Sequence, residues 1–83
     1  MSDPTATAPS WKGPELVSTR FGRRLKAIRL AKGYTQERLG RTAKRDRSFI
    51  SDLERGVKEP TISTIDMLAS EFSMTISEFL EGV

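Results

Sequence analysis

The sequence predicts an all-α fold of five short helices. Apolar residues recur three or four positions apart over most of the chain, which is the spacing of one face of a helix. Four of the five apolar segments follow a Thr or Asp that can cap a helix, at Thr35, Asp46, Thr61 and Thr75. No segment shows the alternation of apolar and polar residues that is typical of a strand. With 83 residues the chain forms one domain, which buries roughly 60–65% of its unfolded surface.

The first helix is predicted to begin at Ser18, or slightly before it, and to end before Gly33. Its apolar face is formed by three residues at positions i, i+4 and i+7: Phe21, Leu25 and Ile28. Gly33 suits the left-handed position just after a helix, and Tyr34 follows it where a side chain packs back on the last turn.

The second helix is predicted from about Gln36 to Thr42, with Thr35 as its N-cap. Its apolar positions are few, chiefly Leu39 and Ala43, so its stability must come from neighbouring elements.

The third helix is predicted to follow Asp46 as its N-cap and to run to Arg55, with Gly56 in the left-handed position after it. Ile50 and Leu53 recur at helical spacing and face inward. Five side chains that can donate or accept hydrogen bonds are left facing outward: Arg47, Ser48, Ser51, Asp52 and Arg55. Such a face suits the base edges and phosphates of a nucleic acid.

Thr61 is predicted to cap a fourth helix whose apolar residues complete the core: Ile62, Ile65, Leu68, Ala69 and Phe72. The fifth helix carries the clearest cap in the chain, since Thr75 and Glu78 have the spacing of a capping box. Phe79 and Leu80 follow, and Gly82 ends the helix.

Residues 1–17 are predicted to form a flexible arm, and residues 18–83 the folded domain. The stretch from Met1 to Pro14 offers almost no apolar surface to offset the entropy lost on ordering. Trp11 is its only large apolar residue. It can anchor the arm on the domain, reach a nucleic acid beside Lys12, or stay loosely held.

Charge is unevenly distributed along the chain, although the net charge is only +3. Residues 20–58 hold thirteen Lys or Arg against four acidic residues, a local charge of +9, whereas residues 59–83 hold five acidic residues and no Lys or Arg. A basic run is often just a solvated surface, but this one coincides with the second and third helices. We therefore expect a polyanion as partner.

The composition argues against an enzyme, a metal site and a membrane protein. The chain has no Cys and no His, which excludes disulfides and thiolate metal ligands and removes the commonest catalytic base. We expect no cofactor and no small-molecule ligand. No apolar run approaches the roughly 20 residues of a membrane span, and the first residues do not resemble a signal peptide. The expected location is the cytoplasm.

Four consecutive segments resemble the helix-turn-helix proteins of the Cro and phage-repressor type, the XRE family. They cover about residues 20–81 and read RLKAIRLAKGYTQERLG, RSFISDLERG, PTISTIDMLAS and MTISEFLEG. The resemblance implies a compact five-helix fold of the lambda-repressor type, with the second and third helices as the helix-turn-helix. The chain departs from the family in the turn, where Lys44 and Arg45 replace the usual Gly and apolar residue.

The family resemblance implies a homodimer that binds double-stranded DNA at a pseudo-palindromic operator, with recognition helices in successive major grooves. The residues that match base-reading positions are Arg47, Ser48, Ser51 and Asp52. Those assigned to the DNA backbone are Thr35, Gln36, Arg45, Arg55 and Lys58. Asp52 can accept from cytosine or can instead orient Arg47 or Arg55, and Phe49 can touch a thymine methyl or belong to the core.

Two further features follow from the same resemblance. Arg29 and Glu54 match a buried or half-buried structural ion pair that ties the first helix to the third. The C-terminal apolar residues can simply close the core, but the resemblance implies that part of their surface pairs with the second subunit: Met74, Ile76, Phe79 and Val83.

The recognition segment most resembles the controller proteins of restriction–modification systems, which regulate their own expression. Glu37 matches the position where activating family members contact RNA polymerase, with basic Arg41 beside it, so activation and repression both stay open. The alternative function is an antitoxin or protein-interaction adaptor that also binds DNA. RNA is less favoured as a ligand because no aromatic platform for stacking bases is present.

Overall fold

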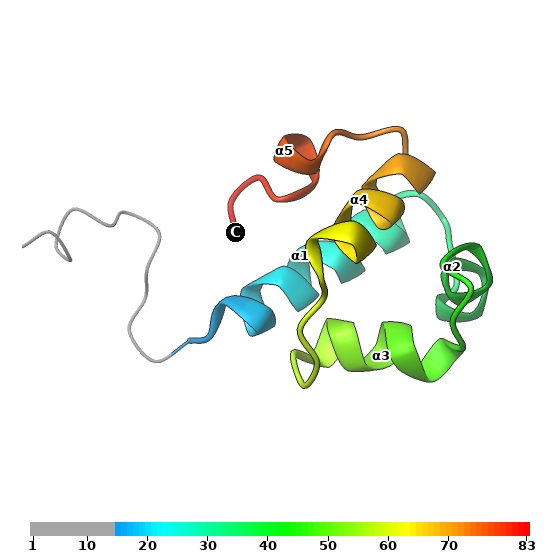
Figure 1. Ribbon diagram of the computed structural model, residues 1–83, viewed down its shortest axis with the longest axis horizontal. Helices are drawn as coiled ribbons and strands as arrows, with labels where there is room; N and C mark the ends of the chain where they lie inside the picture. Colours follow the sequence, from blue (N-terminus) through cyan, green and yellow to red (C-terminus); the bar gives the residue numbers. More distant parts are fainter. Residues whose placement is uncertain (1–14) are drawn as a thin grey trace, which may run out of the picture.

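The computed structural model describes residues 15–83, which form five helices and no strand (Figure 1). In chain order the helices are α1 (Val17–Ala31), α2 (Gln36–Thr42), α3 (Arg47–Arg55), α4 (Ile62–Glu71) and α5 (Ile76–Phe79). The predicted all-α fold and the predicted order of its elements are confirmed. Most of the predicted arm, with Trp11, lies outside the described residues.

The start of α1 agrees with the predicted start at Ser18 or slightly before it. α1 begins at Val17, and the Glu15 carboxylate before it forms an ion pair with Arg23. The guanidinium of Arg23 lowers the pKa of Glu15, first through their hydrogen bond. Glu15, which the sequence analysis placed in the arm, thus contacts α1.

The predicted caps are present at four of the five helix starts. The side chains of Thr35, Asp46, Thr61 and Thr75 each accept a hydrogen bond from the backbone N–H three residues later, at 3.0 to 3.1 Å. At α5 the box is complete, because the Glu78 carboxylate also accepts from the Thr75 N–H at 2.9 Å. These local bonds explain why the helix bounds could be predicted closely.

α1 is the central element of the domain (Figure 1). α3 packs on one side of it and α2 packs on α3, while α4 and α5 close the other side. The core is formed by apolar residues from all five helices and by the residues that follow α2 and α4: Phe21, Leu25, Ile28, Leu39, Ala43, Ile50, Leu53, Leu68, Ala69, Phe72 and Phe79. Ile62, which was predicted to belong to this core, is instead 75% exposed, because the first position of α4 faces away from α1.

α1 and α3 approach each other so closely at Gly22 that no side chain fits there. A Cβ on Gly22 would lie 2.4 Å from the carbonyl oxygen of Glu54 and 2.5 Å from that of Leu53. Glycine within a helix is otherwise unfavourable by about 0.5–1 kcal/mol relative to Ala. Its presence here permits the contact that sets the position of the C-terminal half of α3.

The turn between α2 and α3 contains a residue in the left-handed conformation, Lys44, with φ of 57°. The Lys44 N–H donates to the carbonyl of Arg41, and the Arg45 N–H donates to that of Gly40 at 2.8 Å. This pair of bonds is the Schellman arrangement that normally ends in glycine. The turn thus keeps the geometry expected of a helix-turn-helix although its glycine is replaced.

Gly22→Ala should lower the free energy of unfolding by about 1–3 kcal/mol, because the new methyl group meets two backbone carbonyls. Urea unfolding of the purified protein measures the change. Ala27→Gly, at an exposed position of the same helix, gives the size of the helix-propensity term alone. A stabilised Gly22→Ala variant would contradict the close approach of α1 and α3.

Lys44→Gly should raise the free energy of unfolding by about 0.5–1 kcal/mol, because glycine adopts positive φ without the Cβ clash. The matched control is Lys44→Ala, which removes the same charge but keeps the Cβ. If urea unfolding shows that both variants gain the same stability, the removal of charge repulsion and not the backbone conformation is responsible.

Candidate nucleic-acid interface

α3 presents a polar face because its apolar residues are fixed inward. Ile50 and Leu53 are fully buried between α1 and α2. On the opposite side Arg47, Ser48 and Arg55 are exposed, and Ser51 and Asp52 are half-buried. The structure therefore brings all five residues predicted to face outward onto one surface.

The expected ion pair between Arg29 of α1 and Glu54 of α3 is present and buried. Nε of Arg29 lies 2.6 Å from one Glu54 oxygen, and Nη2 lies 3.2 Å from the other. Their side chains are only 9% and 4% exposed. Nη1 of Arg29 donates to the carbonyl of Tyr34 at 2.8 Å, so the guanidinium also fixes the loop that leads into α2.

Gln36 extends this ion pair to the surface. Its amide nitrogen donates to Glu54 at 3.0 Å, and its amide oxygen accepts from Nη1 of Arg47 at 3.2 Å. Four side chains, Arg29, Glu54, Gln36 and Arg47, thus form one hydrogen-bonded chain from α1 to the start of α3. Arg47 is held in place by the core through this chain.

Asp52 bonds to Arg55, whose Nη2 lies 2.8 Å from the carboxylate. The sequence analysis left open whether Asp52 accepts from a base or orients Arg47 or Arg55, and in the structure it orients Arg55. Both groups stay accessible, at 28% and 64% side-chain exposure, so Asp52 retains an oxygen for a further donor.

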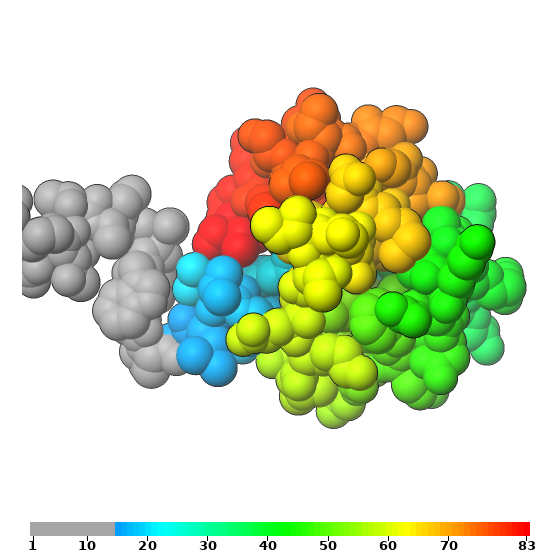
Figure 2. Space-filling model, viewed as in Figure 1, coloured from blue at the N-terminus to red at the C-terminus, as the bar shows by residue number. Residues whose placement is uncertain are grey.

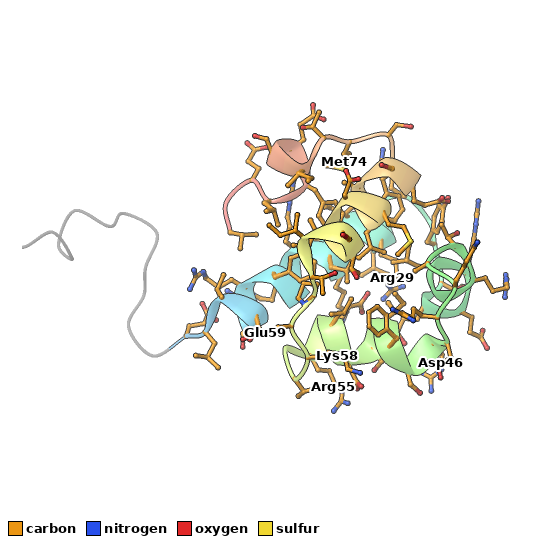
Figure 3. The ribbon with its side chains drawn as sticks, viewed as in Figure 1. Arg29, Asp46, Arg55, Lys58, Glu59 and Met74 are labelled. Carbon is orange, nitrogen blue, oxygen red and sulfur yellow. The ribbon has the colours of Figure 1, made fainter. Side chains whose placement is uncertain are left out.

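Three cations surround the polar face of α3. Arg45 precedes the helix, Arg55 ends it, and Lys58 lies in the loop that follows. The labelled Asp46, Arg55 and Lys58 lie on the same side of the molecule, whereas Met74 lies on the opposite side of α1 (Figure 3). Thr35 and Gln36 complete this side at the N-terminus of α2, where exposed N–H groups favour an anion.

Phe79 is not at the surface, so its predicted place in the dimer interface is wrong. It is fully buried, with its ring stacked on Phe72 at 6.4 Å between centroids and tilted against Phe21 at 5.9 Å. The helical spacing of the C-terminal segment could not show which of its apolar residues meets the core. Met74, Ile76 and Val83 are half-buried and keep part of their surface in contact with solvent.

Two arginines of α1 hold the C-terminal segment, a role that the sequence analysis missed. Nε of Arg20 donates to the carbonyl of Val83 at 2.8 Å. Arg24 donates to the carbonyls of Phe79 at 2.9 Å and Glu78 at 2.8 Å. The only signal in the sequence was charge, since basic α1 and the acidic C-terminal segment complement each other.

Tyr34 links the region before α2 to α4. Its ring packs edge-on against Phe72, and the Arg38 guanidinium lies 3.9 Å from its centre. Its hydroxyl donates to Glu71 of α4, and this hydrogen bond raises the pKa of Tyr34. The N-terminus of α2 is therefore fastened on two sides, by Tyr34 and by Arg29.

Nothing in residues 15–83 suggests a metal centre or a membrane span. No group of three or more acidic side chains gathers there in a metal-binding arrangement. None of the five helices is long and apolar enough to cross a bilayer.

Comparison with known proteins places this surface in context. The family described as helix-turn-helix matches residues 25–79. The chain is 35% identical over 60 residues to the HTH-type transcriptional regulator DdrOP3 of Deinococcus deserti, which covers 72% of this chain and 46% of that protein. It is 36% identical over 56 residues to the immunity repressor protein of Bacillus phage phi105, covering 68% of this chain and 39% of the repressor. The chain thus spans less than half the length of either relative.

The fold is also similar to that of a solved regulator. The restriction–modification controller protein C.AhdI from Aeromonas hydrophila superposes with a TM-score of 0.72 and 33% sequence identity. The match covers 76% of this chain and 96% of C.AhdI.

Glu54→Gln should lower the free energy of unfolding by about 3–5 kcal/mol, because it leaves the buried Arg29 charge without its partner. The double variant Arg29→Met with Glu54→Leu should lose much less, since it removes both charges and keeps the volume. Urea unfolding of the two variants decides the point. Equal losses would mean that apolar packing around the pair, and not the charge, governs this site.

Proposed function

The chain belongs to the helix-turn-helix family, in its XRE-type branch, and from that premise we propose that it is a transcriptional regulator that binds a pseudo-palindromic DNA operator as a dimer. The observation that carries the proposal is the series of side-chain hydrogen bonds that runs from Arg29 through Glu54 and Gln36 to Arg47. A guanidinium that is hydrogen-bonded in this way, at the start of an exposed polar helix, is in place to meet a base edge.

In this proposal α3 lies in the major groove. Arg47 donates two bonds to O6 and N7 of guanine, the commonest specific contact in protein–DNA complexes. Ser48 and Ser51 contact neighbouring base edges. Asp52 accepts from a cytosine amino group with the oxygen that Arg55 leaves free, so its bond to Arg55 and its contact with a base are compatible.

The DNA backbone is contacted from both ends of the recognition helix. Arg45 and Lys58 lie beside its two ends, and Arg55 closes its last turn. Thr35 and Gln36 provide the contact at the N-terminus of α2. With about three phosphates neutralised per subunit, by Arg45, Arg55 and Lys58, a dimer gives a slope of roughly −5 in a plot of log affinity against log salt.

The second subunit is proposed to cover the C-terminal side of the domain, through Met74, Ile76 and Val83. A mostly apolar cavity of about 190 Å³ opens beside Val83, lined in part by Val17, Phe21, Ile65 and Leu80. Leu16, Val17 and Ile62 are each more than half exposed. A second copy would cover this apolar surface while leaving both recognition helices free on the other side of α1.

The biological setting that fits best is a controller protein of a restriction–modification system. The support is the 33% identity to C.AhdI over nearly the whole of that protein. Such a regulator works in the cytoplasm and needs no enzymatic activity. Glu37 is exposed on α2 beside exposed Arg41, so a contact with RNA polymerase at this position stays a prediction.

A fluorescence-anisotropy titration at two salt concentrations tests the proposal, with duplex DNA from upstream of the gene and with scrambled DNA. The upstream duplex should bind about a thousandfold more tightly, with two subunits per site. Arg47→Ala should cost about 1–3 kcal/mol on that duplex and little on scrambled DNA, whereas Lys58→Ala should weaken both. The matched control is Arg41→Ala, which removes an exposed charge outside the proposed contact set.

Two results would contradict the proposal. Equal binding of both duplexes, with parallel release as salt rises, would reduce the basic face to a non-specific surface. Equal losses on both duplexes for Arg47→Ala would exclude Arg47 as a base reader.

A further inference from the structure

Two cations from different segments meet at one aromatic ring beside the recognition surface. The Arg45 guanidinium carbon lies 5.1 Å from the centre of the Phe49 ring, and Nζ of Lys58 lies 5.4 Å from it. Arg45 belongs to the turn before α3, and Lys58 to the loop after it. Both distances are within the range of roughly 6 Å over which a cation is attracted to the face of a ring.

The ring itself is fixed, unlike the cations. Phe49 is half-buried and packs against the hydrophobic core. Its N–H donates to Asp46 at 3.0 Å, which anchors the residue in the first turn of α3. Arg45 and Lys58 are exposed and carry long side chains with many rotamers. Contact with the fixed ring therefore lowers the conformational entropy of both cationic side chains before a ligand binds. Less entropy is then left to lose on binding.

The surroundings leave the charges of these two cations available. The same concave surface is lined by Arg45, Asp46, Ser48, Phe49, Asp52 and Lys58. Asp46 accepts from the Phe49 N–H, and Asp52 accepts from Arg55 at 2.8 Å. In residues 15–83 neither Arg45 nor Lys58 forms a salt bridge with these or other carboxylates.

We propose that Phe49 is a positioning residue that holds Arg45 and Lys58 as a clamp for one phosphodiester group of duplex DNA. An aromatic face attracts cations without neutralising them, so the clamp is already assembled and still positive when the phosphate arrives. This inference rests on the proposed function and specifies how α3 is fastened to the DNA backbone.

The test compares Phe49→Leu, which removes the ring but stays apolar, with Phe49→Tyr, which keeps it. In the free protein, proton NMR should show the Lys58 ε-CH₂ and Arg45 δ-CH₂ signals shifted upfield by the ring. These shifts should disappear in Phe49→Leu and persist in Phe49→Tyr. Phe49→Met replaces the Leu variant if circular dichroism shows that Leu does not fold.

Affinity for DNA provides the second measurement, on folded protein only. Phe49→Leu should weaken binding to scrambled and upstream duplexes alike by about three- to tenfold, the equivalent of one or two cation–π contacts. Phe49→Tyr should bind about as tightly as the wild type. Lys58→Gln should cost less in the Phe49→Leu background than in the wild type, since the two residues act together.

The outcomes separate the clamp from the proposed function. If the wild type binds no duplex, the proposed function fails and the clamp fails with it. If the wild type binds and Phe49→Leu binds equally well, only the clamp is overturned. A loss confined to the upstream duplex would also overturn it, because Phe49 would then act on the bases. A loss of stability without a change in affinity would show that the ring serves the core alone.

Discussion

The arrangement of this domain depends on one buried ion pair, Arg29 with Glu54. Removing two charges from water is costly, and such a pair persists only when its remaining donors and acceptors are satisfied. Here Arg29 also bonds to the Tyr34 carbonyl and Glu54 also bonds to Gln36, and no buried side-chain polar atom in residues 15–83 lacks a partner. The pair therefore fixes the register of α1, α2 and α3, while apolar burial supplies most of the stability.

Close backbone contacts complete this register. At Gly22 the last turn of α3 approaches α1, and at Gly40 the turn before α3 approaches α2, where a Cβ would lie 2.9 Å from the Asp46 carbonyl oxygen. Both ends of α3 are thus set by contacts that tolerate no side chain. The space-filling view shows α2 and α3, in green, joined into one surface, with the end of the chain, in red, on another side of the domain (Figure 2). A recognition helix held at both ends presents its polar face as a rigid unit.

The sequence predicted what local chemistry determines. Thr35, Asp46 and Thr75 cap their helices because the bonding partner of each lies three residues away, and the polar face of α3 followed from the spacing of Ile50 and Leu53. The exposure of Ile62 and the burial of Phe79 could not be predicted, because both depend on which side of a short helix meets α1. The roles of Arg20 and Arg24 escaped for the same reason, since their partners lie more than fifty residues away.

The charge count along the sequence overstates what is available to a ligand, and the structure shows where the remainder lies. Arg20, Arg23, Arg24 and Arg29 of α1 all bond to carboxylates or carbonyls of this chain. Of the cations that form no ion pair within residues 15–83, Arg45, Arg47 and Lys58 are grouped around α3, whereas Lys26, Lys32, Arg38, Arg41 and Lys44 lie elsewhere on the domain. The charge that a polyanion meets at α3 is therefore that of a few side chains around Arg47, and not the local charge of +9 counted along the sequence.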